Sequence, residues 1–217
     1  MIVLHDYWRS SSAYRVRIGL ELLGLPYESR PVDLVKGEQR GAENLGRNPQ
    51  GLVPVLEIDG RSLTQSLAIL EYLDETRGAG FLPKDAPGRA RVRALSYAVA
   101  MEIQPVCNLR VARHAAEASG GDIAQEAWMR HFIALGLEGL EGMLGDGGAG
   151  RFCHGDQVTL ADLCLVPQLY NARRWGVELA PTPRVEAIEA ALQAIPAVRA
   201  AHPDAARARH EAGRAGP

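Results

Sequence analysis

A run of three hydroxyl side chains follows a short apolar segment near the start of the chain. Ser10, Ser11 and Ser12 stand between the apolar run at residues 2–5 and a helical pattern that begins near residue 16. The start of a helix has unpaired N–H groups and a partial positive charge, so it suits an anion. A thiolate held there would also gain a hydrogen bond from a serine hydroxyl, which would lower the pKa of the thiol. Serine is also a preferred N-cap residue, so simple helix capping is the alternative.

Two further pairs of residues carry comparable alternatives. Val53-Pro54 opens an apolar run, where the proline suits an edge strand or a cis turn. A cis bond would turn the Val53 backbone toward a bound peptide, whereas an ordinary strand-start proline has no such role. Gln65-Ser66 directly precedes a helical pattern, and Ser66 either caps that helix or helps its N-terminus to hold a carboxylate.

These residues must be positioned by the first third of the chain, which alternates strand-like and helix-like patterns. Strands are predicted at 2–5, 27–32, 53–58 and 62–64, and helices at 16–23, 36–45 and 67–73. Asp59-Gly60 is a strong hairpin signal between the last two strands. This order predicts a mixed sheet of about four strands.

The rest of the chain has a different character. Residues 78–87 are rich in Gly and Pro and are predicted to be a linker. Beyond the linker, helical patterns run over 89–117, 123–144, 160–174 and 184–194. We therefore expect two domains, an α/β domain at 1–80 and an all-α domain at 88–217. The stretch from His202 has no apolar face and is expected to be a frayed tail.

The composition excludes several classes of protein. The net charge of -2 provides no general attraction to nucleic acid or to an anionic membrane. No apolar run approaches the length of a membrane helix, and the N-terminus does not resemble a signal peptide. The cysteines Cys107, Cys153 and Cys164 lack metal-binding spacing, so we expect no metal, reduced thiols and a cytoplasmic location.

Several motifs taken together resemble the zeta class of glutathione transferases. Residues 10–18, Ser-Ser-Ser-Ala-Tyr-Arg-Val-Arg-Ile, are similar to the class pattern Ser-Ser-x-x-x-Arg-Val-Arg-Ile. Segments that match the same class lie at 48–54, 65–73, 103–110 and 155–168. The resemblance extends from residue 2 to about 203. It implies a glutathione transferase fold: a thioredoxin-like domain with a mixed four-stranded sheet, followed by an all-helical domain. It also implies a homodimer.

The resemblance implies a role for individual residues. Ser10 would stabilise the thiolate of glutathione, with Ser11 and Ser12 completing the loop. Many relatives have a cysteine in place of Ser12, so its absence argues against an obligatory covalent role there. The residues implied to hold the rest of glutathione are Gln39, Val53, Gln65, Ser66, Gln104 and Asn108.

The implied activity is the isomerisation of maleylacetoacetate to fumarylacetoacetate, in the catabolism of phenylalanine and tyrosine. A thiolate adds to the cis double bond, the resulting single bond rotates, and elimination returns glutathione. The substrate is a keto acid with two carboxylates, which arginine binds in bidentate fashion better than lysine does. Arg9, Arg110 and Arg174 stand where related isomerases bind these groups, although Arg173 competes with Arg174. The catalytic residues would be Ser10, Ser11 and Arg9.

Other interpretations remain open. A maleylpyruvate isomerase would use the same fold and cofactor, but Ser12-Ala13 favours the first substrate because the pyruvate enzymes tend to have Ser-Gly-Thr in this loop. A general zeta-class transferase and a non-catalytic glutathione-binding protein are further alternatives. Arg17 and Asp162 are expected to be structural, Asp162 as part of a capping box with Thr159.

Overall fold

The computed structural model describes residues 1–214. The chain forms two compact units. The first comprises Met1–Phe81 together with the chain from Ala194 onward, and the second comprises Leu82–Gln193. The boundary between Phe81 and Leu82 falls inside the Gly- and Pro-rich segment that was predicted to be the linker.

The first unit is built on a four-stranded mixed sheet. Its strands are β1 (Val3–Asp6), β2 (Glu28–Pro31), β3 (Val55–Ile58) and β4 (Arg61–Thr64), in the order β2-β1-β3-β4. The β1–β2 pair is parallel and the other two pairs are antiparallel. The predicted hairpin between β3 and β4 is confirmed: Asp59 and Gly60 have φ of 52° and 71°, and positive φ at both central residues is what a tight hairpin of this type requires.

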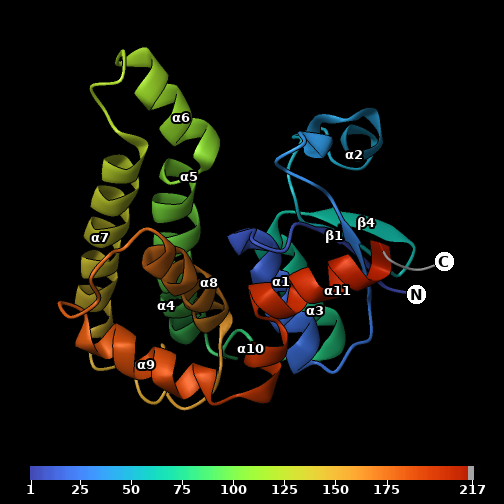
Figure 1. The fold of residues 1–217 in the computed structure, drawn as a ribbon. Helices are drawn as coiled ribbons and strands as arrows, with labels where there is room; N and C mark the ends of the chain where they lie inside the picture. The colour runs from blue at the N-terminus through green and yellow to red at the C-terminus, as the bar shows by residue number, and fades with distance from the viewer. Residues whose placement is uncertain (215–217) are drawn as a thin grey trace. The chain divides into compact units, whose positions relative to one another are not determined.

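Two helices of the first unit pack against each other, as Figure 1 shows for α1 (Ser11–Leu22) and α3 (Ser66–Arg77). The weak helix predicted at 36–45 is a short 3-10 turn, η1 (Glu38–Arg40), followed by α2 (Ala42–Arg47). The apolar side chains of α1 are buried from Ala13 to Leu20, and so are its two arginines, Arg15 and Arg17.

The chain after Ala194 corrects two expectations. It was assigned to the all-helical domain and to a frayed tail, but it packs on the first unit. Helix α10 (Pro196–Ala200) contacts α1, and α11 (Pro203–Arg214) contacts β2. The sequence of α11 has no apolar face, and the helix packs instead through small and polar side chains. Ala206 and His210 are both buried.

The second unit is entirely helical apart from an isolated bridge between Ala149 and Gly155. Its elements are α4 (Ala86–Tyr97), the π-helical segment η2 (Ala98–Ile103), α5 (Gln104–Val106), α6 (Leu109–Ala118), α7 (Gln125–Leu144), α8 (Leu160–Arg174) and α9 (Pro183–Gln193). The single run predicted at 89–117 is therefore broken at Cys107. Pro105 has no N–H to continue the hydrogen-bond pattern, and Asn108 caps a new helix.

Buried polar groups of the second unit are satisfied at the start of α8. Asp162 accepts hydrogen bonds from the N–H and hydroxyl of Thr159, at 2.7 and 2.8 Å, and from the N–H of Cys153 at 2.9 Å. Burial raises the pKa of Asp162, and these hydrogen bonds oppose that shift. The structural role predicted for Asp162 is confirmed. Within residues 1–214, no helix has the length and apolar character needed to span a membrane.

Candidate functional site

Three predicted site segments are brought to the same end of the sheet by strand register. His5 of β1 pairs with Val55 of β3, which in turn pairs with Thr64 of β4. The chain leaves β1 into the serine loop, enters β3 from Val53, and leaves β4 into Gln65-Ser66. The antiparallel pairing of these three strands therefore gathers the two helix starts and the Val53 segment in one region of the first unit.

The serine loop runs directly into α1. Ser10 is the N-cap residue, and its Oγ accepts a hydrogen bond from the N–H of Ala13 at 3.2 Å. The N–H of Ser10 donates to the carbonyl of Tyr7 at 2.8 Å, which closes the turn that follows β1. A hydroxyl has one donor hydrogen besides its acceptor sites, so capping leaves Ser10 able to donate to an anion. The capping and anion-binding roles of Ser10 are thus compatible.

The segment before β3 is held by its own side chains. Asn48 donates from Nδ2 to the carbonyl of Leu52 at 3.0 Å and accepts from the N–H of Gln50 at 3.1 Å. Gly51 has a φ of 65°, and a Cβ there would lie 3.3 Å from the carbonyl of Gln39, so glycine allows this close approach. The bond between Val53 and Pro54 is cis. Val53 is half-buried at the entry to β3.

The start of α3 combines an unusual backbone with a buried cation. Gln65 precedes the helix with a φ of 67° and a ψ of 111°, a conformation that costs a residue other than glycine about 1–3 kcal/mol. Its side chain donates from Nε2 to Oε1 of Gln50 at 2.8 Å. Ser66 is buried, and its Oγ accepts a hydrogen bond from Nη1 of Arg15 at 3.2 Å. A serine hydroxyl, a helix N-terminus and a buried guanidinium together favour an anion such as a carboxylate.

Gln39 provides a test of whether these residues suit a peptide cofactor. It is half-buried in η1, and its Oε1 is buried with no hydrogen-bond partner among residues 1–214. A buried amide oxygen without a partner is costly unless a bound group completes it. A tripeptide offers N–H donors for such an oxygen and a carboxylate for the start of α3. The donor set of the first unit therefore fits glutathione.

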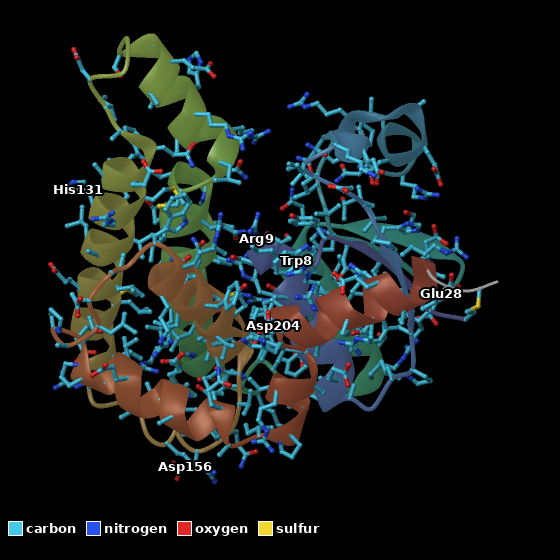
Figure 2. The ribbon with its side chains drawn as sticks, in the orientation of Figure 1. Trp8, Arg9, Glu28, His131, Asp156 and Asp204 are labelled. Carbon is cyan, nitrogen blue, oxygen red and sulfur yellow. The ribbon has the colours of Figure 1, made fainter. Side chains whose placement is uncertain are left out.

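Arg9 lies immediately before the serine loop, next to Trp8 at the start of α1 (Figure 2). Its guanidinium carbon is 5.0 Å from the centre of the Trp8 ring, within the range of a cation–π interaction. Arg9 is half-buried. This placement keeps a positive charge within one residue of Ser10.

The remaining predicted residues belong to the second unit. Asn108 is the N-cap of α6, and its Oδ1 accepts from the N–H of Arg110 at 3.1 Å, so part of its side chain has a structural role. Gln104 begins α5 immediately after the π-helical segment and is half-buried, and Arg110 is exposed on α6.

The two arginines at the end of α8 have different surroundings. Arg173 forms an ion pair with Glu189 of α9 through both terminal nitrogens. Arg174 is exposed, with its guanidinium carbon 4.8 Å from the centre of the Trp175 ring. The ion pair gives Arg173 a structural contact, and Arg174 remains a proposed ligand of a substrate carboxylate.

Sequence reasoning missed the contribution of Arg15, which it considered only for its spacing from Arg17. The signal that was available is the position of a cation beside Val16 and Ile18, within the apolar pattern of α1. Arg17 has a different role. It donates to Asp6, to the carbonyl of Trp8 and to that of Ala201, which confirms the structural role predicted for it.

Comparison with known protein families gives two matches. Residues 9–76 match the family described as "Glutathione S-transferase, N-terminal domain". Residues 123–204 match the family described as "Glutathione S-transferase, C-terminal domain". The first match contains every first-unit site residue predicted above, and the second ends just inside α11.

Individual proteins are similar over nearly the whole chain. The maleylacetoacetate isomerase of Rhizobium meliloti is 59% identical over 207 residues, which cover 94% of this chain and 97% of that protein. A crystal structure of maleylacetoacetate isomerase from Anaeromyxobacter dehalogenans, with glutathione bound in its active site, is 51% identical with a TM-score of 0.85, covering 94% of this chain and 96% of that one. The holo structure of a bacterial zeta-class maleylpyruvate isomerase is 41% identical with a TM-score of 0.89, covering 94% and 97% of the two chains.

Proposed function

The chain belongs to the zeta-class glutathione transferases, the family of the maleylacetoacetate isomerases, and from this premise we propose that it converts maleylacetoacetate to fumarylacetoacetate with glutathione as cofactor. The observation that carries the proposal is the strand register that gathers the serine loop, Val53 and Ser66 at one end of the sheet. These segments offer the three kinds of group that a tripeptide thiol needs: a hydroxyl for the sulfur, a backbone for the peptide and a helix start for the carboxylate.

In the proposed mechanism, Ser10 and Ser66 perform different tasks. When bound, glutathione supplies a nucleophilic sulfur for reversible addition to the double bond of the substrate. Ser10 donates its hydroxyl hydrogen to that sulfur, and the start of α1 adds a partial positive charge, so both favour the ionised thiol. Ser11 and Ser12 complete the loop. Ser66, supported by Arg15, binds the γ-glutamyl carboxylate together with Gln65, and Val53 pairs with the peptide through its backbone.

The substrate is a dicarboxylate, so binding it requires cations. Arg9 is proposed to bind one carboxylate and to stabilise negative charge that develops beside Ser10. Arg110 and Arg174 are proposed as further carboxylate ligands, and Gln104 and Asn108 as further contacts to glutathione. The exposure of Arg110 and Arg174 supports these roles because neither side chain is buried in the core of its unit.

The proposal also covers the oligomeric state and the cellular location of the protein. We propose a homodimer, as is usual for the family, and a cytoplasmic location. The second is supported by the three cysteines, all of which are buried free thiols. Sedimentation of the purified protein and fractionation of cells test these two properties.

The direct test is an assay of purified protein on maleylacetoacetate, with and without glutathione. We expect turnover that depends on glutathione and that falls about a hundredfold to a thousandfold in Ser10→Ala, the loss typical of removing one donor from a developing anion. Ser12→Ala is the matched control within the same loop, and it should lose less activity. Turnover that is unchanged in Ser10→Ala would contradict the role assigned to Ser10.

Maleylpyruvate is the second candidate substrate because the chain resembles a zeta-class maleylpyruvate isomerase with a TM-score of 0.89. It should be assayed in parallel. Activity on maleylpyruvate alone would retain the site and correct the substrate. Glutathione binding without turnover of either compound would indicate a binding protein and would overturn the roles of the three arginines.

A further inference from the structure

Helix α11 has no role in the function proposed above. The match to the C-terminal family domain ends at residue 204, so almost all of α11 lies beyond it. Yet α11 packs against β2 of the first unit. In the same unit, β1 leads directly into the serine loop. The contacts between α11 and this loop suggest a function for the helix.

A buried polar cluster joins α11 to the end of β1. Nε2 of His210 lies 2.8 Å from Oδ1 of Asp6 and 2.8 Å from Oγ of Ser29. Ser29 also donates to Oδ1 of Asp6 at 3.0 Å, and Oδ2 of Asp6 accepts from Nη1 of Arg17 at 2.6 Å. The side chains of Asp6 and Arg17 are fully buried. Burial raises the pKa of Asp6, but the hydrogen bond from His210 and the charge of Arg17 outweigh it and lower that pKa overall.

Arg17 connects this cluster to the loop. Its Nη2 donates to the carbonyl of Trp8 at 2.8 Å, and its Nε donates to the carbonyl of Ala201 at 3.1 Å. The cluster therefore links α11, through His210 and Asp6, to the backbone two residues before Ser10.

A second contact reaches the same residue from α11. The guanidinium carbon of Arg207 is 5.4 Å from the centre of the Trp8 ring, which also contacts Arg9. Arg207 is oriented by a hydrogen bond of 2.8 Å from its Nε to Glu211, one turn further along α11. Trp8 is thus held at its carbonyl by Arg17 and at its ring by Arg207.

The surroundings of Trp8 make these contacts important. A cavity of about 400 Å³ is lined by Tyr7 and Trp8, by Arg207, His210 and Glu211 of α11, and by residues at and beyond the end of β2. Side chains do not fill this space, so apolar packing does not fix the loop on this side. The position of the loop depends instead on a few directed contacts.

We propose that α11 is a positioning element for the serine loop, with His210 and Arg207 as its positioning residues. His210 holds the Asp6–Arg17 pair, and Arg207 holds the Trp8 ring, so together they fix the placement of Arg9 and Ser10. The consequence for catalysis rests on the proposed function, whereas the consequence for loop order does not.

The experiment compares two classes of α11 variant. His210→Leu and Arg207→Ala remove contacts that lead to the loop. Arg209→Ala is the matched control: Arg209 lies on the same helix and bonds Glu21 and the carbonyl of Ala200, at 2.9 and 3.0 Å, but makes no contact with the loop among residues 1–214. All three changes weaken the attachment of α11, but only His210 and Arg207 make contacts that lead to Trp8.

We expect faster amide hydrogen exchange in residues 8–14 of His210→Leu and Arg207→Ala, with unchanged exchange there in Arg209→Ala. Turnover should fall roughly tenfold to a hundredfold in the first two variants, because a small displacement of a reacting group has effects of that size. The dissociation constant for glutathione should change less than kcat, since Val53 and Ser66 are not held by α11. His210→Gln retains a donor and should restore both exchange and turnover.

Equal effects of Arg207→Ala and Arg209→Ala on loop exchange would overturn the proposal and leave α11 a purely structural helix. His210→Leu tests the buried cluster, and if that variant does not fold, the comparison of Arg207→Ala with Arg209→Ala still decides between the two outcomes. Failure of the wild-type protein to bind glutathione would overturn the proposed function instead, while the exchange comparison would stand.

Discussion

The guanidinium of Arg15 donates from Nη1 to Oγ of Ser66 across 3.2 Å, and both side chains are buried. A guanidinium carries only donors, so the hydroxyl hydrogen of Ser66 cannot point toward Arg15. It is directed elsewhere, and the start of α3 is where the proposed function has a carboxylate bind. Arg15 thus makes Ser66 a donor to an anion and adds a buried positive charge behind it.

Arg15→Met is therefore expected to weaken the binding of glutathione by roughly tenfold or more. Hydrogen bonds to charged groups contribute about 1.5–3 kcal/mol, and about 1.4 kcal/mol corresponds to a factor of ten in affinity. Isothermal titration calorimetry of the wild-type protein, Arg15→Met, Ser66→Ala and the double variant measures the effect. Because the two residues act on one carboxylate, the double variant should lose less than the sum of the single losses. Additive losses would show that Arg15 acts independently of Ser66.

The stability of the first unit should be sensitive to the loss of either partner of the buried pair of Asp6 and Arg17. Asp6→Asn leaves the guanidinium of Arg17 buried without its counter-charge, and breaking one side of a buried pair costs about 3–5 kcal/mol. Urea unfolding of Asp6→Asn should show this loss. Replacing both residues, as Asp6→Asn with Arg17→Met, should recover part of it. A double variant as unstable as Asp6→Asn alone would mean that the unpaired charge is not the cause.

The same pair gives the stability a defined dependence on pH. The pKa of Asp6 is lowered from 3.8 because the bond to His210 and the charge of Arg17 outweigh the cost of burial. A carboxyl with a lowered folded-state pKa contributes stability above its unfolded pKa and loses it as pH falls through the folded value. The free energy of unfolding should therefore decline below about pH 4 less steeply in Asp6→Asn than in the wild-type protein. Parallel declines would contradict this assignment.

The sequence was sufficient to predict the elements of the first unit, and insufficient to predict where the end of the chain packs. Alternating and helical apolar patterns predicted all four strands, and Asp59-Gly60 predicted the hairpin, because both signals are local. Helix α11 was missed because its packing depends on polar partners, Asp6 and Ser29, that are far away in sequence. No periodicity in the α11 sequence contains that information.

In the candidate site, too, local features were predictable from the sequence and contacts between distant residues were not. Ser10 and Ser66 were predicted from local signals, since a hydroxyl at a helix start is visible in the sequence. The support that Arg15 gives to Ser66 was not predicted because it spans 51 positions of the chain. Likewise, Arg173 and Arg174 are adjacent and chemically identical, so the sequence did not show that Arg173 pairs with Glu189, 16 positions away.

The two arginines at the end of α8 should behave differently when each is replaced. Arg174→Gln should raise the KM for the dicarboxylate substrate about tenfold, since it removes a charge-assisted contact worth about 1.5 kcal/mol. Arg173→Gln should leave that KM unchanged and lower the stability by about 1 kcal/mol, because Arg173 is partly exposed where it pairs with Glu189. Steady-state kinetics and urea unfolding of both variants check the prediction. A raised KM in Arg173→Gln alone would reverse the assignment.

The cysteines should be inert in the folded protein, so that the reacting thiol is the one that glutathione brings and not one of the chain's own. Burial raises the pKa of Cys107 to about 11 and raises that of Cys153 well above its usual value, and Cys164 is fully buried. At pH 8, only about one Cys107 thiol in a thousand is then ionised, and the thiolate is the reactive form. Iodoacetamide should therefore label the folded protein slowly and, once excess reagent is removed before glutathione is added, leave turnover unchanged. Urea-unfolded protein should gain three labels, as mass spectrometry would show. Rapid loss of activity that matches labelling of any one cysteine would contradict the inert character expected of the cysteines, and Cys107→Ser would then identify whether that thiol is responsible.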